Sequence, residues 1–146
     1  MENNKNNLAH ILLVEDNEGD ILLTQEAFET CKVKTQISIA KNGQEALDFL
    51  FKRGEYVNAK KPDLILLDIN LPIFNGHEVL KLIKADSMLK KIPVIMLTTS
   101  SSQKDLDDAY ENHCNSYVKK PLEINEFLEA ILKIEEFWLQ LTTLSA

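Results

Sequence analysis

The sequence predicts an α/β fold in which helices cover both faces of a parallel β-sheet. Five short apolar runs of strand length alternate along the chain with segments whose apolar residues recur at helical spacing. The runs at residues 64–67 and 94–97 are wholly apolar, as expected of strands that are buried on both faces. Five successive strand–helix units of this kind predict a doubly wound sheet of five parallel strands.

The five strands are each marked by a compact run of residues with few charges. They are expected at residues 10–15, 35–40, 63–68, 92–99 and 115–120. The connection GEYVNAKKP at residues 54–62 precedes the third strand and is longer than most loops.

The helices follow from apolar residues at spacings of three and four and from capping residues. They are expected at residues 20–31, 44–53, 76–86 and 103–112, and a long helix follows Pro121. The first helix places Ile21, Phe28 and Cys31 on one side. Two pairs have the spacing of a capping box, Asn42 with Glu45 and Asn75 with Glu78.

Composition limits the function classes. The chain has 146 residues, enough for one domain, of which residues 1–8 are expected to be a disordered arm and residues 9–146 a single domain with no output domain. A net charge of −7 argues against a nonspecific nucleic-acid partner. No secretory signal or membrane span is evident, and Cys31 and Cys114 lack metal-ligand spacing, so a cytoplasmic protein with free thiols is expected.

Polar residues follow the strands at the edge of the sheet where ligands bind in open α/β folds. Glu15 and Asp16 end the first strand, and Asp68 ends the third. If these strands are neighbours, three carboxylates converge, and a divalent cation would relieve their repulsion. Mg²⁺ suits such a set of oxygen ligands. Helix capping by Asp16 or Asn17 is the plainer alternative for the first pair.

A hydroxyl and an ammonium complete this edge. Thr98 lies at the end of the fourth strand, and Lys119 and Lys120 lie at the end of the fifth. A carboxylate can attack phosphorus and hold an acyl phosphate, provided that a metal and a lysine neutralise the phosphoryl oxygens. The set therefore fits a site where a carboxylate takes up a phosphoryl group, with the Thr98 hydroxyl placed to hydrogen-bond that group.

Four segments, ILLVEDN, LILLDINLPIFNGHEVL, IPVIMLTTS and SYVKKPL, resemble those of response-regulator receiver domains in two-component signalling. The resemblance covers roughly residues 8–134 and implies a flavodoxin-like (βα)5 fold with strand order 2-1-3-4-5. It implies that Asp68 accepts the phosphoryl group, that Thr98 and Tyr117 form the switch, and that Lys120, not Lys119, pairs with the phosphoryl group. The remaining implied positions are Mg²⁺ ligands at Glu15, Asp16, Asp68 and the backbone carbonyl of Asn70, and a frequently cis bond before Pro121.

The resemblance also implies partners. A sensor histidine kinase would donate the phosphoryl group, and a downstream protein or phosphotransfer partner would receive the signal. The segments EDNEGDILLTQEAF and IEEFWLQL resemble the stand-alone receivers of cyanobacterial phytochromes, which implies a light-sensing kinase. Two departures from the common pattern are Glu15, where aspartate is usual, and Thr99, where a smaller residue is usual; Thr99 is expected to slow access to Asp68.

The C-terminal segment predicts a helix from Glu123 to about Leu141 with one apolar stripe. The stripe consists of Ile124, Phe127, Ile131, Ile134, Trp138 and Leu141. Such a helix would extend beyond the sheet and present Phe137, Trp138 and Leu141. Two interpretations stay open: this turn packs on its own domain, or it forms a homodimer contact or a docking surface.

The residues favour a switch that is phosphorylated and has no enzymatic output. Three other functions fit them less well. An aspartyl phosphatase needs a second acid two residues after its nucleophile, where this chain has Asn70. A nucleotide-binding module needs a glycine-rich phosphate loop, and the chain has only four glycines. The third alternative is a degenerate receiver that binds partners without phosphorylation, against which the intact set of acids, hydroxyl and lysine argues.

Overall fold

The computed structural model describes residues 8–121 and 123–141, without the side chain of residue 141. Its sheet has five parallel strands in the order β2-β1-β3-β4-β5, which confirms the expected topology. The strands are β1 (Ala9–Val14), β2 (Thr35–Ala40), β3 (Leu64–Leu67), β4 (Val94–Thr98) and β5 (Ser116–Lys119).

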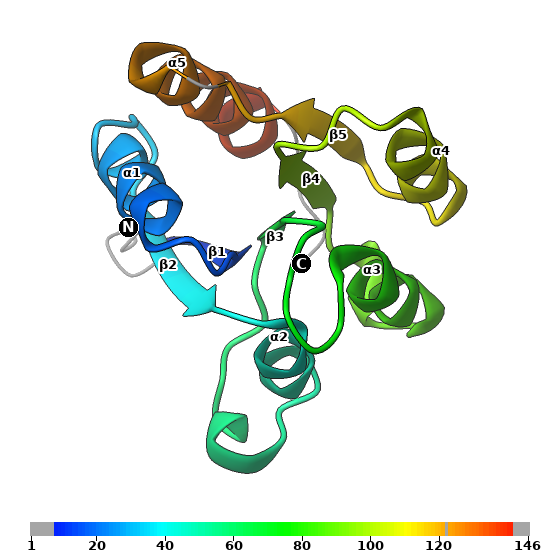
Figure 1. Ribbon diagram of the computed structural model, residues 1–146. Coiled ribbons are helices and arrows are strands. Elements are labelled where there is room, and N and C mark those ends of the chain that lie inside the picture. The colour runs from blue at the N-terminus through cyan, green and yellow to red at the C-terminus, as the bar shows by residue number, and fades with distance from the viewer. Residues whose placement is uncertain (1–7, 122, 142–146) are drawn as a thin grey trace.

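Helices cover both faces of the sheet (Figure 1). One face carries α1 (Glu18–Glu29) and α5 (Ile124–Ile134), and the other carries α2 (Gly43–Leu50), α3 (Gly76–Ala85) and α4 (Gln103–Glu111). Successive residues of a strand point to opposite faces, so the apolar runs fill two cores at once. In β3, for example, Leu64 and Leu66 pack with α1 and α5, whereas Ile65 and Leu67 pack with α2 and α3.

The capping residues act largely as predicted. The side chains of Asn17, Asn42, Asn75 and Ser102 each accept a backbone hydrogen bond at a helix start. Asn75 and Glu78 form a reciprocal capping box. At Asn42 the box is incomplete, because Glu45 accepts from the backbone N–H of Lys41 instead. The Asn17 cap also starts α1 at Glu18, two residues before the predicted start.

The C-terminal segment differs from the continuous α-helix that was expected. α5 ends at Ile134, and Glu135–Leu141 continues as a wider π-helix. Glu135 is buried, and its carboxylate accepts hydrogen bonds from the Val33 backbone N–H at 3.0 Å and from Gln140 Nε2 at 2.8 Å. The bond to Val33 holds the start of the π-helix against the α1–β2 loop. Because the π-helix is wider than an α-helix, the predicted apolar stripe does not continue at its spacing of three and four residues.

The change in winding divides the predicted stripe. Trp138 packs on the core between the sheet, α1 and α5, whereas Phe137 is 54% exposed. Ile124 is 58% exposed, so its expected place on the buried stripe is wrong, since it lies at the first position of α5. The predicted contribution of the Leu141 side chain lies outside the described residues, as does nearly all of the predicted N-terminal arm. Within the described residues, no helix has the length and apolar character needed to cross a bilayer.

Candidate functional site

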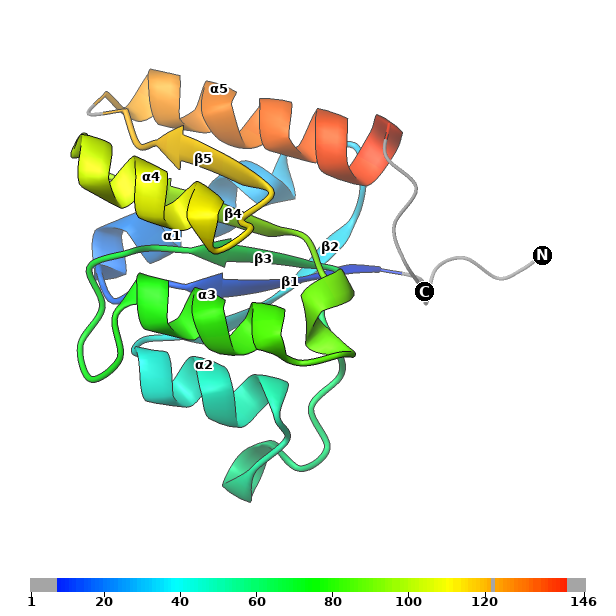
Figure 2. The same ribbon diagram turned by 90° about the vertical axis from the view of Figure 1, so that its right-hand side faces the viewer.

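The site lies at the carboxyl ends of the strands, where the connections to the helices gather at one end of the sheet (Figure 2). β1 and β3 are paired neighbours with Val14 opposite Leu67. The residues that follow, Glu15 and Asp68, therefore leave the sheet side by side. Thr98 ends β4, and Lys120 directly follows β5.

Three carboxylates meet at this edge as predicted. Oxygens of Glu15, Asp16 and Asp68 lie within 4.8 Å of one another. Glu15 and Asp68 are buried and Asp16 is exposed, so the group opens to solvent on one side. Carboxylate oxygens at this separation are ligands that Mg²⁺ prefers, and their mutual repulsion favours a bound cation. The donor set therefore fits a divalent metal ion.

Backbone hydrogen bonds orient the two buried carboxylates. The N–H of Asn17 donates to Glu15 Oε2 at 3.1 Å, and the N–H of Ile69 donates to Asp68 Oδ1 at 2.7 Å. In each carboxylate the other oxygen faces Lys120 Nζ. In each of these two acids, one carboxylate oxygen is held by a backbone N–H and the other is directed at Lys120.

Lys120 is almost fully buried among acids. Its Nζ forms a hydrogen-bonded ion pair with Glu15 Oε1, lies 2.8 Å from Asp20 Oδ2 and 3.5 Å from Asp68 Oδ2. Burial alone would lower the pKa of Lys120, but the hydrogen bonds to Asp20 and Glu15 and the charge of Asp68 outweigh it, so the pKa is raised. Burial raises the pKa of Glu15 to about 7, against the opposing effect of Lys120. Lys119 is exposed, as expected.

Thr98 is completely buried, and its hydroxyl oxygen accepts a hydrogen bond from the Ser100 N–H at 3.3 Å. Thr99 is exposed at the start of the following loop. Tyr117 is half-buried on β5, and its hydroxyl donates to the Ser100 carbonyl at 3.1 Å. The two predicted switch residues therefore both contact Ser100.

Two predicted positions need separate comment. Asn70 lies in the exposed loop two residues after Asp68. The bond before Pro121 is trans, since no cis peptide occurs in the described part of the chain, whereas the resemblance implied a bond that is frequently cis. The trans form is intrinsically favoured, and the Lys120 N–H reaches the Thr98 carbonyl at 2.7 Å without a cis bond.

A glycine brings α3 close to Asp68. A Cβ atom at Gly76 would lie 2.2 Å from the Asp68 carbonyl oxygen and 2.7 Å from Ile69 Cα. No side chain fits there, so the start of α3 packs directly on the backbone of the acid. The Gly76 N–H also donates to the Ile69 carbonyl at 2.8 Å, which fixes the loop.

Sequence reasoning missed two parts of the site. Asp20 contacts Lys120 from the first turn of α1, and its place as an acid just after the acidic pair that ends the first strand was the available signal. The second part is a network beside the switch: Ser100 Oγ donates to Asp105 Oδ2 at 2.6 Å, and His77 Nε2 lies 3.0 Å from Asp105 Oδ1. These bonds lower the pKa of Asp105, chiefly through Ser100. No local sequence pattern predicts this network, because its members come from α3, α4 and a loop.

Comparisons with known proteins agree with this geometry. The family described as response regulator receiver domain matches residues 11–132. Response regulator Rcp1 of Synechocystis sp. is 43% identical over 136 residues, covering 93% of this chain and 92% of that protein.

Solved structures give the same result. The phosphorylated cyanobacterial phytochrome response regulator RcpA has a TM-score of 0.93 and 44% identity, covering 95% of this chain and 99% of that one. The Mn²⁺-bound form of response regulator Rcp1 has a TM-score of 0.91 and 43% identity, covering 94% and 99% of the two chains.

Proposed function

We propose that this chain, which belongs to the response regulator receiver domain family, accepts a phosphoryl group from a sensor histidine kinase on Asp68. The observation that carries the proposal is the position of the Asp68 carboxylate. It is buried, it shares a three-acid group with Glu15 and Asp16, and its Oδ2 faces Lys120 Nζ at 3.5 Å. Members of this family act as phosphoacceptor switches in phosphorelay signalling.

The transfer requires an oxygen nucleophile and compensation of charge. Asp68 Oδ2 attacks phosphorus, an O–P bond forms, and the P–N bond to the kinase histidine breaks, leaving the electron pair on the imidazole. The Lys120 ammonium donates a hydrogen bond to a phosphoryl oxygen. Mg²⁺, held by Glu15, Asp16 and Asp68, supplies further charge neutralisation when bound, with the Asn70 carbonyl proposed as an additional ligand.

The buried Thr98 hydroxyl then moves towards the phosphoryl group and carries the Ser100 segment with it. Because Tyr117 is bonded to the Ser100 carbonyl, this motion reaches the surface of β5. The altered surface is proposed to select a downstream protein or a phosphotransfer partner.

Intact-mass analysis after incubation with acetyl phosphate, with and without Mg²⁺, tests the acceptor. We expect a metal-dependent gain of one phosphoryl group in the wild type and in Asp107→Asn, whose carboxylate lies exposed on α4. The Asp68→Asn variant should gain none. A phosphoryl group retained by Asp68→Asn would refute the assignment. No adduct with either acetyl phosphate or a phosphorylated histidine kinase would favour a receiver that works without phosphorylation.

Two finer features of the setting are also proposed. The similarity to the phytochrome response regulator RcpA supports a phytochrome-type kinase as donor. The free thiols of Cys31 and Cys114 fit a reducing compartment, which supports the cytoplasm. Phosphotransfer from a purified phytochrome kinase, compared with transfer from an unrelated histidine kinase, tests the first point.

We further propose that the chain forms a homodimer through the end of α5 and the π-helix. The exposed ring of Phe137 borders an apolar cavity of about 340 Å³ whose lining includes Val118, Ile134 and Trp138. A second copy would remove this apolar surface from water. Sedimentation of Phe137→Ser should show weaker self-association than the wild type. The control is Leu22→Ser, which removes an equally exposed apolar side chain from α1.

A further inference from the structure

The Lys120 ammonium has a carboxylate partner outside the three-acid group. Asp20 Oδ2 lies 2.8 Å from Lys120 Nζ, closer than Asp68 Oδ2 at 3.5 Å. We propose that Asp20 is a positioning residue that shares the Lys120 ammonium and draws it partly away from Glu15 and Asp68, and that it thereby strengthens metal binding and shortens the life of the phosphorylated state. The second effect rests on the proposed function, whereas the first does not.

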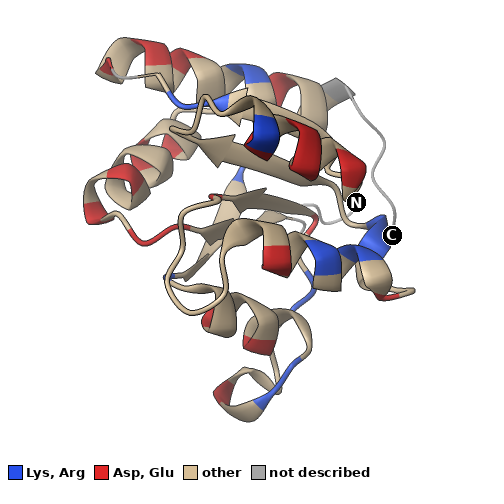
Figure 3. Ribbon diagram, turned by 45° about the vertical axis from the view of Figure 1, so that its right-hand side comes forward, with Lys and Arg blue, Asp and Glu red and all other residues tan. Residues whose placement is uncertain are grey.

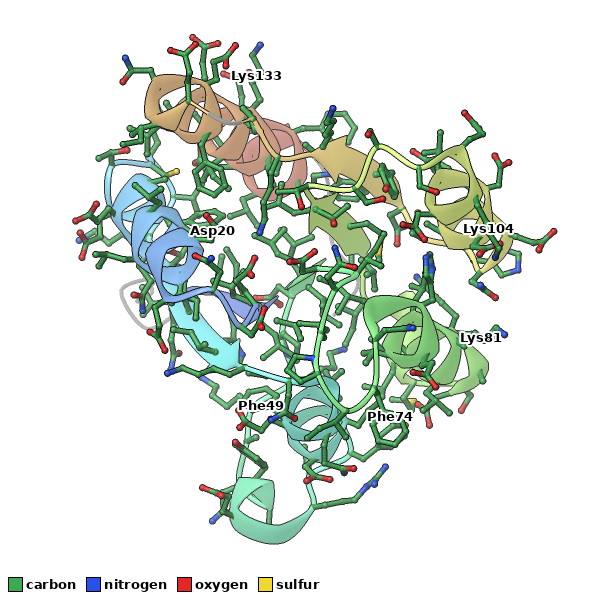
Figure 4. All side chains as sticks on the ribbon, viewed as in Figure 1. Asp20, Phe49, Phe74, Lys81, Lys104 and Lys133 are labelled. Atoms are coloured by element: carbon green, nitrogen blue, oxygen red, sulfur yellow. The ribbon has the colours of Figure 1, made fainter. Side chains whose placement is uncertain are left out.

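The backbone of α1 fixes Asp20 in this role. Its N–H donates to the capping side chain of Asn17 at 2.8 Å, and its carbonyl accepts from the Thr24 hydroxyl at 2.7 Å. Figure 4 shows Asp20 on the inner side of α1, towards the strands. The residue is only 29% exposed in its side chain. Its carboxylate is thus directed at Lys120 by a rigid first helical turn.

An acid in the first turn of a helix has an ordinary explanation, since it interacts well with the helix dipole. α1 has another such acid, Glu18, whose carboxylate lies 2.6 Å from Lys41 Nζ and is 73% exposed. Figure 3 shows the acidic residues of α1 and of the strand ends beside it. The dipole explanation applies equally to Glu18 and Asp20, but the contact with Lys120 belongs to Asp20. The two residues therefore form a matched pair for experiment.

The metal effect follows from competition for oxygen atoms. Lys120 contacts carboxylates of Glu15 and Asp68, and these two residues are also members of the three-acid group that would hold a divalent cation. Asp20 gives the ammonium a partner that does not belong to the metal-ligating group. Without that carboxylate, Lys120 would rest more fully on Glu15 and Asp68, and one negative charge near the cation would be lost. Both changes weaken metal binding.

The phosphoryl effect follows from competition for the ammonium. A phosphoryl group on Asp68 must share the hydrogens of Lys120 with Asp20, and the two anions repel each other across the site. Hydrolysis relieves this repulsion: a water oxygen bonds to phosphorus, and the bond to the Asp68 oxygen breaks with its electron pair left on the carboxylate. Inorganic phosphate leaves, and the proton lost by water passes to solvent. Neutralising residue 20 stabilises the phosphorylated state and should slow its loss.

The first measurement uses Mn²⁺ alone, titrated into the unphosphorylated protein and followed by the electron paramagnetic resonance of the free ion. Asp20→Asn should weaken Mn²⁺ binding by at least about threefold. Asp20→Glu should restore much of the affinity, and Glu18→Gln should leave it unchanged. Equal losses in Asp20→Asn and Glu18→Gln, or no loss in either, would overturn the proposal. Circular dichroism melting checks that each variant is folded. We expect the variants at residue 20 to fold, because its side chain is partly exposed.

The second measurement is the half-life of the phosphoryl group at saturating Mg²⁺ after the donor is removed. Asp20→Asn should lengthen it by at least about threefold, with Glu18→Gln as the unchanged control. A half-life that is unaltered or shorter would contradict this part. If the wild type takes up no phosphoryl group, the proposed function fails by itself, and the Mn²⁺ titration still decides the role of Asp20.

Discussion

Tyr117 donates its hydroxyl hydrogen to the backbone carbonyl of Ser100, and this 3.1 Å bond joins β5 to the loop after β4. The same loop is held on its other side, because the Ser100 hydroxyl donates to Asp105 on α4 at 2.6 Å. Ser100 is also bonded through its N–H to the buried hydroxyl of Thr98. One residue therefore connects the phosphoryl site, β5 and α4, and a shift of Thr98 must affect both surface elements.

The Tyr117→Phe variant removes the bond to Ser100 and keeps the ring. We expect its free energy of unfolding to fall by about 0.5–1.5 kcal/mol, the usual net contribution of one hydrogen bond. Urea denaturation measures the change. Tyr56→Phe is the control, since the Tyr56 ring packs on Phe49 and its hydroxyl has no hydrogen bond within the described structure. An equal loss in both variants would contradict a specific role for the Ser100 contact.

Asp105 should make stability dependent on acid pH. Its pKa lies below the ordinary value of 3.8, chiefly because Ser100, and secondarily His77, stabilise the carboxylate. A group whose pKa is lowered by folding stabilises the protein above its ordinary pKa and loses this effect as the pH falls through the folded value. The stabilisation that Asp105 contributes relative to Asp105→Asn should therefore be present above its ordinary pKa of 3.8 and shrink as the pH falls below that value.

Denaturation curves at several pH values check this expectation, with Asp107→Asn as a control that removes a charge from the same helix. Asp107 binds only Gln103 of its own helix, at 2.9 Å, among the contacts that the structure describes. A difference for Asp105→Asn that grows on acidification would have the wrong sign and would rule out the assigned cause.

A methyl group at residue 76 should damage the site through the backbone. In Gly76→Ala the new Cβ would meet the Asp68 carbonyl at 2.2 Å, so α3 or the Asp68 segment must shift. Overpacking of this kind costs about 1–3 kcal/mol, which denaturation would measure. Metal binding should weaken as well. Gly19→Ala is the milder control, because the nearest atom to its Cβ is a side-chain oxygen of Asn17 at 3.2 Å.

Thr99 is exposed and directly follows the buried Thr98. We expect Thr99→Ala to accelerate phosphorylation by acetyl phosphate and loss of the phosphoryl group, because a smaller side chain widens access to Asp68. Phosphoprotein mass analysis over time measures both rates. Ser101→Ala, a change at an exposed residue of the same loop, should have little effect. Unchanged rates in Thr99→Ala would remove steric access as the explanation.

Much of the fold was predictable because its signals are local. The wholly apolar run of β3 and the Asn75 cap each identify an element from a few neighbouring residues. The convergence of Glu15, Asp16 and Asp68 followed from one topological rule about strand ends. The winding after Ile134 could not be predicted, because it depends on a hydrogen bond that the Val33 N–H donates to the Glu135 carboxylate, about a hundred residues away in sequence. The contact of His77 with Asp105 was hidden because the two residues lie 28 positions apart, on different helices.

The ion pairs of Lys120 have a consequence for the making of the protein. The acids around it all come from the first half of the chain, and the lysine follows the last strand. A ribosome-bound chain that has emerged only as far as β4 carries mutually repelling carboxylates at its sheet edge with no Lys120 to offset them. Glu15, Asp20 and Asp68 can therefore pair with Lys120 only after the final strand–helix unit has been synthesised. Chains shortened before β5 should therefore be less stable than the full chain, because these acids have lost their cationic partner.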